Sequence, residues 1–243
     1  MTELLELKRE AALACRVIAS AGLSTPLLGH VSIRLSERRM LVRCRGPLER
    51  GLRFTTVDDV RETDLEGTFD DADGYRLPNE FPIHAEILRA RPEVDAVLHA
   101  HPESALLGGL ADVPIRPVFG AFSIPAFRMA DRGVPVHEHR GLVRDADSGR
   151  ALALTLAGGP AVLLRGHGIV TVGAGAAQAL ARALALDELL RVCVELARLG
   201  ADPTPVSGSD RQDLPDLGAD FNERALWRYH VAELEREGLA DVG

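Results

Sequence analysis

The sequence predicts an α/β protein whose central sheet contains antiparallel strand pairs. Stretches with apolar residues at helical spacing alternate with short apolar runs, which are typical of buried strands. Two pairs of these runs, residues 31–35 with 40–44 and residues 161–164 with 169–172, have short connections. Such links suit antiparallel pairing, because a parallel crossover needs about a dozen residues or more.

The chain begins with a predicted helix, followed by the first strand pair. Apolar residues recur at helical spacing over residues 3–21, and Gly22 then ends the helix. Residues 31–35 and 40–44 are predicted strands on either side of a polar turn. Residues 56–60 are predicted to form a turn or a short helix.

The middle of the chain is predicted to supply a helix, a strand and an irregular segment. The helix opens at Asn79 or Pro82 and runs to about Ala90, because Pro92 breaks it. Residues 96–101 form an apolar strand. Residues 114–135 are rich in Pro, Gly and Phe, which predicts an irregular lid or interface segment.

The C-terminal part repeats the alternation before it becomes polar. Its predicted elements are a helix over 146–156, strands over 161–164 and 169–172, a long helix over 176–199, a linker over 201–218 and a final helix over 221–237. We therefore expect a single domain over residues 1–243. Its core spans about 4–200, and the linker and last helix occupy 201–243.

Composition excludes several classes of function. The 243 residues are enough for one large domain, and the net charge of −8 argues against nucleic acid as a partner. No run of 18 uncharged apolar residues occurs, so no membrane span is expected. The chain starts without a signal-peptide pattern, and its three cysteines are widely spaced, so we expect a cytoplasmic protein without a disulfide framework.

Two histidines two residues apart, His99 and His101, are the strongest functional signal. Residues i and i+2 of a strand point to the same face, so both imidazoles can reach one ion. Glu80 lies upstream, and His167 directly precedes another apolar run. Three histidines and a glutamate predict a catalytic site for a divalent cation, since such donors suit Zn, Mn, Fe or Co.

Other residues near this pattern have two interpretations each. Glu80 could transfer a proton beside a divalent ion and the apolar Phe81, or it could simply cap the following helix. His84 lies four residues further on and is predicted to support the site or to belong to the core. His30 could donate a hydrogen bond or relay a proton, or it could be a plain turn histidine.

For two further clusters, an interpretation outside the site is favoured. His137 and His139 form a second pair, but it lacks an apolar strand run on both sides, so we predict a surface loop. Tyr229 and His230 follow Trp227, and a packed terminal helix is the favoured interpretation of that segment.

These residues make the chain resemble the class II aldolase/adducin family over roughly residues 4–200. The blocks that carry the resemblance are Gly29-His30-Val31-Ser32, Pro78-Asn79-Glu80-Phe81-Pro82-Ile83-His84, the run to His99-Ala100-His101-Pro102, and the segment from His167 to Gly200. The resemblance implies a three-layer α/β/α sandwich around a mainly antiparallel sheet. It also implies one divalent metal ion per subunit, with His99, His101 and His167 as ligands. Glu80 would be the acid/base and would contact the empty metal.

The resemblance and the charge pattern also indicate how a small anionic substrate would bind. In the family, the position of Arg45 and Gly46 faces the substrate anion, and arginine matches a carboxylate in a bidentate manner. Arg165, two residues before His167, is another candidate for this role. The predicted substrate-binding residues are Gly29, Arg45, Gly46, Asn79 and Arg165; His30 joins Glu80 as catalytic, and His84 and Tyr229 are possible supporting residues. Family members are commonly tetramers with sites at subunit borders, so a homotetramer is expected.

Departures from the sugar-phosphate aldolases of the family favour its decarboxylase branch. Pro78 and Asn79 replace the two serines that hold phosphate, and His30 replaces an asparagine. Phenylalanines stand where a tyrosine is expected. The resemblance therefore implies a metal-dependent carbon–carbon lyase that decarboxylates a hydroxylated aromatic dicarboxylate, such as a 3,4-dihydroxyphthalate-type acid.

Three alternatives remain open at the level of sequence. An aldolase or epimerase would act on an unphosphorylated hydroxy-acid or sugar, and the aldolase would release an aldehyde. A non-heme iron oxygenase on the same scaffold would consume oxygen. A non-catalytic adducin-like module would have degraded ligands, whereas all four candidate ligands are present here.

Overall fold

The central element of the structure is a seven-stranded sheet. The computed structural model describes residues 3–69 and 73–243. The strand order is β3-β2-β1-β4-β7-β6-β5, and all neighbours are antiparallel except β5 and β6. The strands are β1 His30–Arg34, β2 Arg39–Arg43, β3 Val60–Asp64, β4 Ala96–Ala100, β5 Val136–His137, β6 Ala161–Leu164 and β7 Gly168–Gly173.

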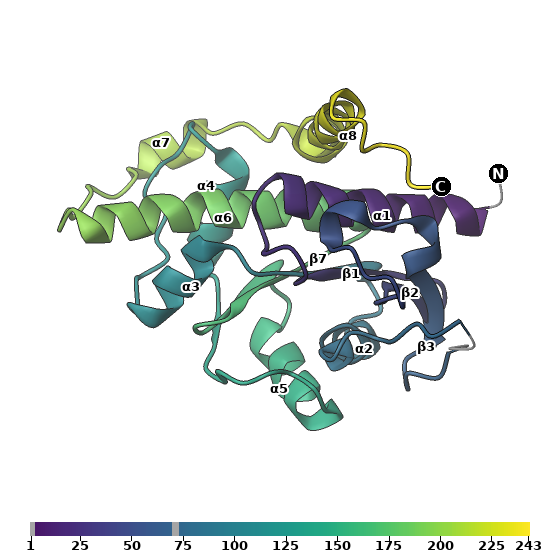
Figure 1. Cartoon of the computed structure of the whole chain (residues 1–243). Helices are drawn as coiled ribbons and strands as arrows, with labels where there is room; N and C mark the ends of the chain where they lie inside the picture. Colours follow the sequence, from purple (N-terminus) through teal and green to yellow (C-terminus); the bar gives the residue numbers. More distant parts are fainter. Residues whose placement is uncertain (1–2, 70–72) are drawn as a thin grey trace.

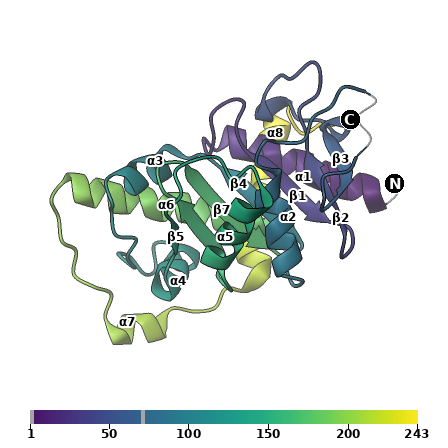
Figure 2. The same ribbon diagram turned by 90° about the horizontal axis from the view of Figure 1, so that it is seen from below.

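Helices cover both faces of this sheet. Helices α1 (Glu3–Ser20) and α6 (Ala176–Arg198) lie on one face (Figure 1), whereas α2 (Phe81–Ala90) and α5 (Ala146–Leu156) lie on the other, facing the viewer in Figure 2. The remaining helical segments are α3 Glu103–Leu110, α4 Ile124–Arg132, α7 Gly208–Asp213, α8 Leu226–Arg236, two 3₁₀ turns η1 Leu52–Phe54 and η2 Val57–Asp59, and the π-helical η3 Asp220–Ala225. The architecture is the expected α/β/α sandwich.

The alternation of side chains along the central strands decides which residues face which helices. In β4, Leu98 packs in the core that α1 and α6 share, whereas Val97 packs in the core under α2 and α5. His99 is two residues from Val97 and therefore faces the same side as α2. His30 lies directly opposite His99 in the β1–β4 ladder, which brings the two rings together.

The start of α2 agrees with its sequence signals. Glu80 occupies the N-cap position and Pro82 lies in the first turn, where its missing N–H costs nothing. Arg91 ends the helix directly before Pro92, as predicted from the inability of proline to continue it. Helix α2 packs extensively on α5, and the two helices together cover the face of the sheet to which Val97 of β4 points.

The segment 114–135, predicted as irregular, contains helix α4. Pro125 falls in the first turn of this helix, where proline is tolerated, so its presence did not exclude a helix. Ala126, Met129 and Ala130 of α4 are buried in the core that α4 shares with α6. An amphipathic pattern of fewer than three turns was obscured by the flanking prolines and glycines.

Other boundaries also differ from the predictions. Helix α7 interrupts the predicted linker, with the side chain of Ser207 accepting a hydrogen bond at its start. The last helix begins as the π-helical η3. The polar strand β3 and the glycine-containing α3 were not predicted, because neither shows a clear apolar period. Within residues 3–69 and 73–243, no helix has the length and apolar character that crossing a bilayer requires.

Candidate metal centre

Four side chains from separate parts of the chain converge at the end of β4. His99 lies in β4, His101 follows it, His167 occupies the β6–β7 turn, and Glu80 occupies the N-cap position of α2. Each offers one ligand atom, and these atoms all lie within 4.8 Å of one another. These are the four residues that the sequence predicts as the metal site.

The ring of His99 is oriented by a backbone hydrogen bond. Its Nδ1 lies 2.9 Å from the carbonyl oxygen of Ile169 on β7, and a carbonyl can only accept, so Nδ1 carries the proton. The other nitrogen, Nε2, is then a bare lone pair that points into the cluster. Proteins usually orient a metal-ligating histidine in this way, through a hydrogen bond from the ring nitrogen that does not bind the metal.

The imidazoles of His101 and His167 lie beside that of His99. The ring centroid of His101 lies 4.5 Å from that of His99 and 4.7 Å from that of His167. Burial, together with the neighbouring imidazoles, lowers the pKa of His101 to about 3, so its ring is neutral at physiological pH. Neutral imidazole is the form that coordinates a cation.

Glu80 faces the histidines and does not cap its helix with its side chain. No cap hydrogen bond is formed; instead Oε1 accepts from the backbone N–H of Val143 at 3.0 Å. Oε2 lies 3.3 Å from Nε2 of His99 and 3.4 Å from Nε2 of His167.

Two nitrogen atoms at this site are orphaned. In the described part of the chain, Nε2 of His99 and Nε2 of His167 are buried without a hydrogen-bond partner, although a carboxylate oxygen is close to both. Buried polar atoms without partners are rare in native proteins and call for an ion or another group. Three imidazole nitrogens and one carboxylate oxygen fit a divalent transition metal, so the donor set suits the predicted cofactor.

His30, His84 and Ser32 form a buried chain beside the cluster. Nδ1 of His30 lies 2.6 Å from Nε2 of His84, and Nδ1 of His84 lies 2.7 Å from Oγ of Ser32. The His30 ring is adjacent to that of His99, with centroids 5.1 Å apart. Burial lowers the pKa of His84 to about 3 and lowers that of His30 well below its ordinary value. His84 therefore contacts His30 directly, and its supporting role in catalysis stays a prediction.

The predicted substrate-binding residues divide into two groups. Gly29 has φ 98°, and a Cβ there would lie 3.2 Å from the carbonyl oxygen of His99, so glycine lets β1 approach the cluster. Arg45 reaches toward the same loop, because its guanidinium donates to the carbonyl of Leu27 at 3.5 Å. Asn79 is exposed directly before Glu80. Gly29 and Asn79 therefore border the cluster, whereas Gly46 adjoins Arg45 and lies against Tyr75; contact of these residues with substrate stays a prediction.

Arg165, next to the β6–β7 turn histidine, is paired with two carboxylates. Its guanidinium forms two hydrogen bonds with Glu138, at 2.5 and 3.0 Å, and one with Asp112 at 2.9 Å. It also donates to the carbonyl of Gly109. These contacts tie the β6–β7 turn to α3 and to the segment after β5, and the contact of Arg165 with substrate stays a prediction.

Tyr229 and the second histidine pair do not join the cluster. Tyr229 is 57% exposed on α8 and lines a small cavity beside the end of α1, which contains none of the four candidate ligands. His137 is buried and its Nδ1 lies 3.1 Å from Oγ1 of Thr155, whereas His139 is exposed. Among the described residues, neither histidine belongs to a group of three potential ligands.

Sequence reasoning did not assign a role to two residues that position the site. Ser32 lies two residues after His30 on the same strand, so strand alternation could have placed both on one face. Val143 holds Glu80 through its backbone N–H, and a backbone contact between distant loops leaves no signal in the sequence.

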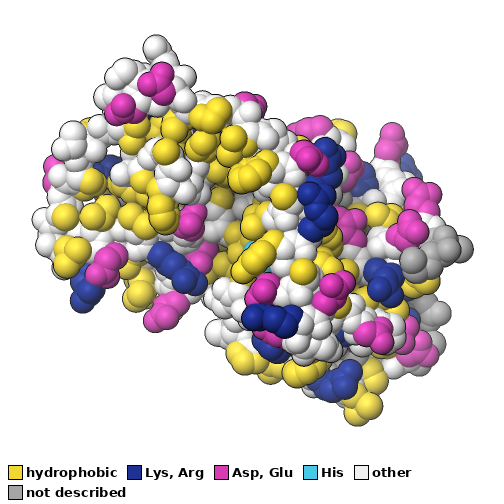
Figure 3. Space-filling view, turned by 90° about the horizontal axis from the view of Figure 1, so that it is seen from above, with side chains coloured by type: hydrophobic (Ala, Val, Ile, Leu, Met, Phe, Trp, Pro, Cys, Tyr) yellow, Lys and Arg dark blue, Asp and Glu magenta, His cyan; other side chains and the backbone are white. Residues whose placement is uncertain are grey.

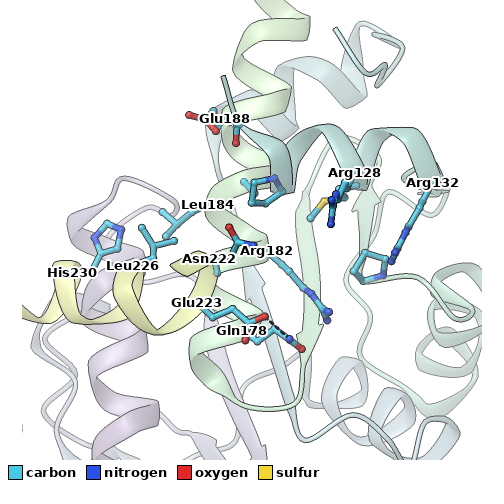
Figure 4. Close-up of a pocket in the computed structure, with 16 residues that line it drawn as sticks. Arg128, Arg132, Gln178, Arg182, Leu184, Glu188, Asn222, Glu223, Leu226 and His230 are labelled. Carbon is cyan, nitrogen blue, oxygen red and sulfur yellow. Dashed lines mark hydrogen bonds between the residues drawn. The ribbon is translucent and has the colours of Figure 1, made fainter. Parts of the chain in front are cut away.

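A larger cavity lies elsewhere in the molecule. It has a volume of about 470 Å³ and is bounded by α4, α6 and the segment from η3 to α8 (Figure 4). Arg128, Arg182 and His230 are among its lining residues, and none of the four candidate ligands is. This side of the molecule carries a gathering of hydrophobic side chains beside mixed charges (Figure 3). The cavity is separated from the candidate metal centre by α6 and the sheet, so it is not the candidate active site.

The fold and the donor set together define a known class of protein. A family model described as the Class II Aldolase and Adducin N-terminal domain matches residues 9–194. The chain therefore belongs to the class II aldolase and adducin family, and the family predicted from the sequence is confirmed. Among solved structures, an aldolase II superfamily protein from Pseudomonas syringae has a TM-score of 0.83 at 20% identity, covering 100% of this chain and 96% of that one.

Curated relatives place the chain within one branch of the family. A 3,4-dihydroxyphthalate decarboxylase of Arthrobacter keyseri is 43% identical over 231 residues, which are 93% of each chain. A 3,4-dihydroxyphthalate decarboxylase of Terrabacter sp. (strain DBF63) is 45% identical, over 91% of this chain and 94% of that one. The resemblance to the decarboxylase branch is thereby confirmed.

Proposed function

We propose that the protein is a metal-dependent decarboxylase of a hydroxylated aromatic dicarboxylate, with a 3,4-dihydroxyphthalate-type acid as its substrate class. The observation that carries this proposal is the identity of 43–45% to two decarboxylases of that name over more than nine-tenths of the chain. The cluster of Glu80, His99, His101 and His167 supports it, because all four groups needed for a metal-assisted lyase are in place.

The metal site is proposed to use the three histidines as permanent ligands. His99 is pre-oriented by the carbonyl of Ile169, and the neutral state of His101 leaves its lone pair available. A bound divalent cation supplies a Lewis acid that stabilises negative charge on oxygen during carbon–carbon cleavage. Three protein ligands leave room for a substrate with neighbouring hydroxyl and carboxylate oxygens.

Glu80 is proposed to move the proton. Its Oε1 is fixed by the N–H of Val143 and its Oε2 faces the histidine cluster, so the carboxylate is placed where it could accept the proton of the substrate hydroxyl. The carboxyl group leaves as carbon dioxide, and its bonding electron pair stays on the ring carbon. Glu80 then returns its proton to that carbon, so a carbon–hydrogen bond replaces the carbon–carbon bond.

The substrate is proposed to lie between Gly29 and the Arg45–Gly46 loop. Arg45 is the arginine of the predicted set that is not held by a carboxylate of the described residues, and it could bind the second carboxylate of the substrate. Asn79 is exposed at the turn before Glu80 and could donate a further hydrogen bond. Holding both ends of a rigid ring would align the breaking bond with the cluster.

Several finer predictions accompany this proposal. We infer from the family resemblance that the protein acts as a homotetramer in the cytoplasm, in aromatic compound catabolism. The four candidate ligands are compatible with Zn, Mn, Fe or Co, because affinity order alone does not select the metal in cells.

The decisive experiment measures carbon dioxide release from a panel of ortho-hydroxy aromatic dicarboxylates by enzyme of known metal content. The proposal expects release from 3,4-dihydroxyphthalate-type acids that is lost in His99→Ala. The matched control is His139→Ala, which removes an exposed histidine of the second pair and should leave release unchanged. Aldehyde release from hydroxy-acids, or oxygen consumption, in place of carbon dioxide release would overturn the proposal in favour of the aldolase or the oxygenase.

A further inference from the structure

The side chains of Ser32, His84 and His30 form a hydrogen-bonded series in which the positions of the hydrogens follow from the surroundings. All three side chains are buried on the α2 side of the sheet, with exposed fractions of 0%, 0% and 6%. Each of the two contacts, Ser32 with His84 and His84 with His30, is short enough for a hydrogen bond. The pattern of donors along these contacts determines whether the outer nitrogen of His30, Nε2, carries a hydrogen or a lone pair.

Two arrangements of protons satisfy both contacts. A neutral imidazole has one N–H and one lone pair, so the tautomer of His84 fixes that of His30. If Nδ1 of His84 donates to Ser32, its Nε2 accepts from Nδ1 of His30, and the outer nitrogen of His30 is a lone pair. If Ser32 donates instead, Nε2 of His84 donates to His30, and the outer nitrogen of His30 carries a hydrogen.

The burial of Ser32 selects between these arrangements. Its hydroxyl is wholly buried, and His84 is its hydrogen-bond partner in the described residues. A hydroxyl that only accepted from His84 would leave its own hydrogen buried without an acceptor, which is costly. A hydroxyl that donates to Nδ1 of His84 leaves no donor unpaired, because an oxygen lone pair without a partner is the smaller penalty.

We propose that Ser32, acting through His84, holds His30 in the Nε2–H tautomer, so that His30 presents a neutral hydrogen-bond donor to the site. Of the two His30 nitrogens, Nδ1 contacts His84, and Nε2 is not among the buried unpaired atoms, so Nε2 keeps access to the space beside the cluster. The His30 ring borders that of His99, which places this donor next to the candidate metal centre.

This assignment gives His30 a role distinct from those of the four clustered residues. A nitrogen that carries a hydrogen cannot coordinate a cation, so His30 stays outside the ligand set although it is adjacent to it. An N–H at this position can bind an anionic oxygen of the substrate, such as that of a carboxylate. This last step rests on the proposed function, whereas the tautomer assignment does not. Ser32 and His84 are positioning residues.

The test reads the tautomer directly. Nitrogen-15 NMR of the histidine side chains, with the His30 signals identified by their loss in His30→Asn, is expected to show hydrogen on Nε2 of His30. Ser32→Ala removes the deciding donor, so a mixture of tautomers or hydrogen on Nδ1 is expected. Ser32→Thr keeps the hydroxyl and should restore the wild-type signals. Hydrogen on Nδ1 in the wild-type protein, or unchanged tautomers in Ser32→Ala, would overturn the proposal.

A matched control and a kinetic measurement separate this role from general packing. Thr171→Val removes a buried hydroxyl of β7, which donates to the carbonyl of Ala179 on the opposite face of the sheet, and should not change the His30 signals. With a substrate established, Ser32→Ala should lower kcat roughly tenfold, the size expected for one hydrogen bond to a charged group, and Ser32→Thr should recover it. An inactive wild-type protein with hydrogen on Nε2 would refute the proposed substrate and leave the tautomer assignment supported.

Discussion

Oε2 of Glu80 lies 3.3 Å from Nε2 of His99, yet these two buried atoms form no hydrogen bond with each other in the described residues. Nε2 of His99 has no hydrogen to donate, because Nδ1 donates to the carbonyl of Ile169. Two lone-pair atoms at this separation repel each other unless a cation or a proton lies between them. The geometry is therefore that of a ligand pair, and it leads to the first prediction.

Removing bound divalent metal should destabilise the protein. A cation at a hundredfold excess over its Kd adds about 2.7 kcal/mol to the free energy of unfolding, which corresponds to a Tm increase of about 5–10 °C for a chain of this size. Thermal unfolding with chelator and after readdition of Zn, Mn, Fe or Co measures this shift. His99→Ala should show no metal-dependent shift, whereas His139→Ala should behave like the wild-type protein. A wild-type Tm that none of these metals changes would contradict a metal centre.

Replacing Glu80 by glutamine should separate proton transfer from metal binding. The amide keeps the shape of the side chain but cannot accept a proton, so kcat should fall by about 10²–10⁴. Metal content should remain substantial, because the three histidines are intact. Glu86→Gln is the control, since Glu86 is buried on the same helix and pairs with Arg89. Unchanged kcat in Glu80→Gln would exclude Glu80 as the proton carrier.

Acid should destabilise the metal-free protein through its buried histidines. Burial, followed by the charge of His99, lowers the pKa of His84 from 6.5 to about 3 in the folded state. As pH falls below 6.5, the unfolded state binds protons first, so the free energy of unfolding is highest above pH 6.5 and decreases toward pH 3. Urea unfolding in chelator between pH 7 and pH 4 measures this slope, and His84→Gln should make it shallower. A slope unchanged by His84→Gln, with His139→Gln as the exposed control, would refute this account.

Alanine at Gly29 should cost both stability and activity. Left-handed backbone at a non-glycine residue costs about 1–3 kcal/mol, and the new Cβ would also press on the carbonyl of His99 at 3.2 Å. Gly133→Ala isolates the backbone contribution, because Gly133 has φ 86° and a Cβ added there would meet nothing within 4 Å. Chemical unfolding and carbon dioxide release are the measurements. Both variants should lose stability, and Gly29→Ala alone should lose activity; equal activity in the two would contradict the close approach.

The fold class and two of the ligands were accessible from local patterns. The short link between β6 and β7 predicted their antiparallel pairing, and the two-residue period of a strand placed His99 and His101 on one face. The family resemblance added His167 and Glu80, and the structure brings both to the same point. Helix α4 was missed because prolines in its surroundings obscured an amphipathic pattern that burial against α6 makes decisive.

The sequence by itself determined the local elements, because strand and helix periods and turn residues act over only a few neighbouring residues. The packing of α2 on the sheet decided that Glu80 faces His99 rather than capping its own helix, and that His84 contacts His30. The packing of the β6–β7 turn against α3 and the segment after β5 paired Arg165 with Glu138 and Asp112. These outcomes depend on contacts between segments far apart in sequence, and no period or spacing within one segment encodes such contacts.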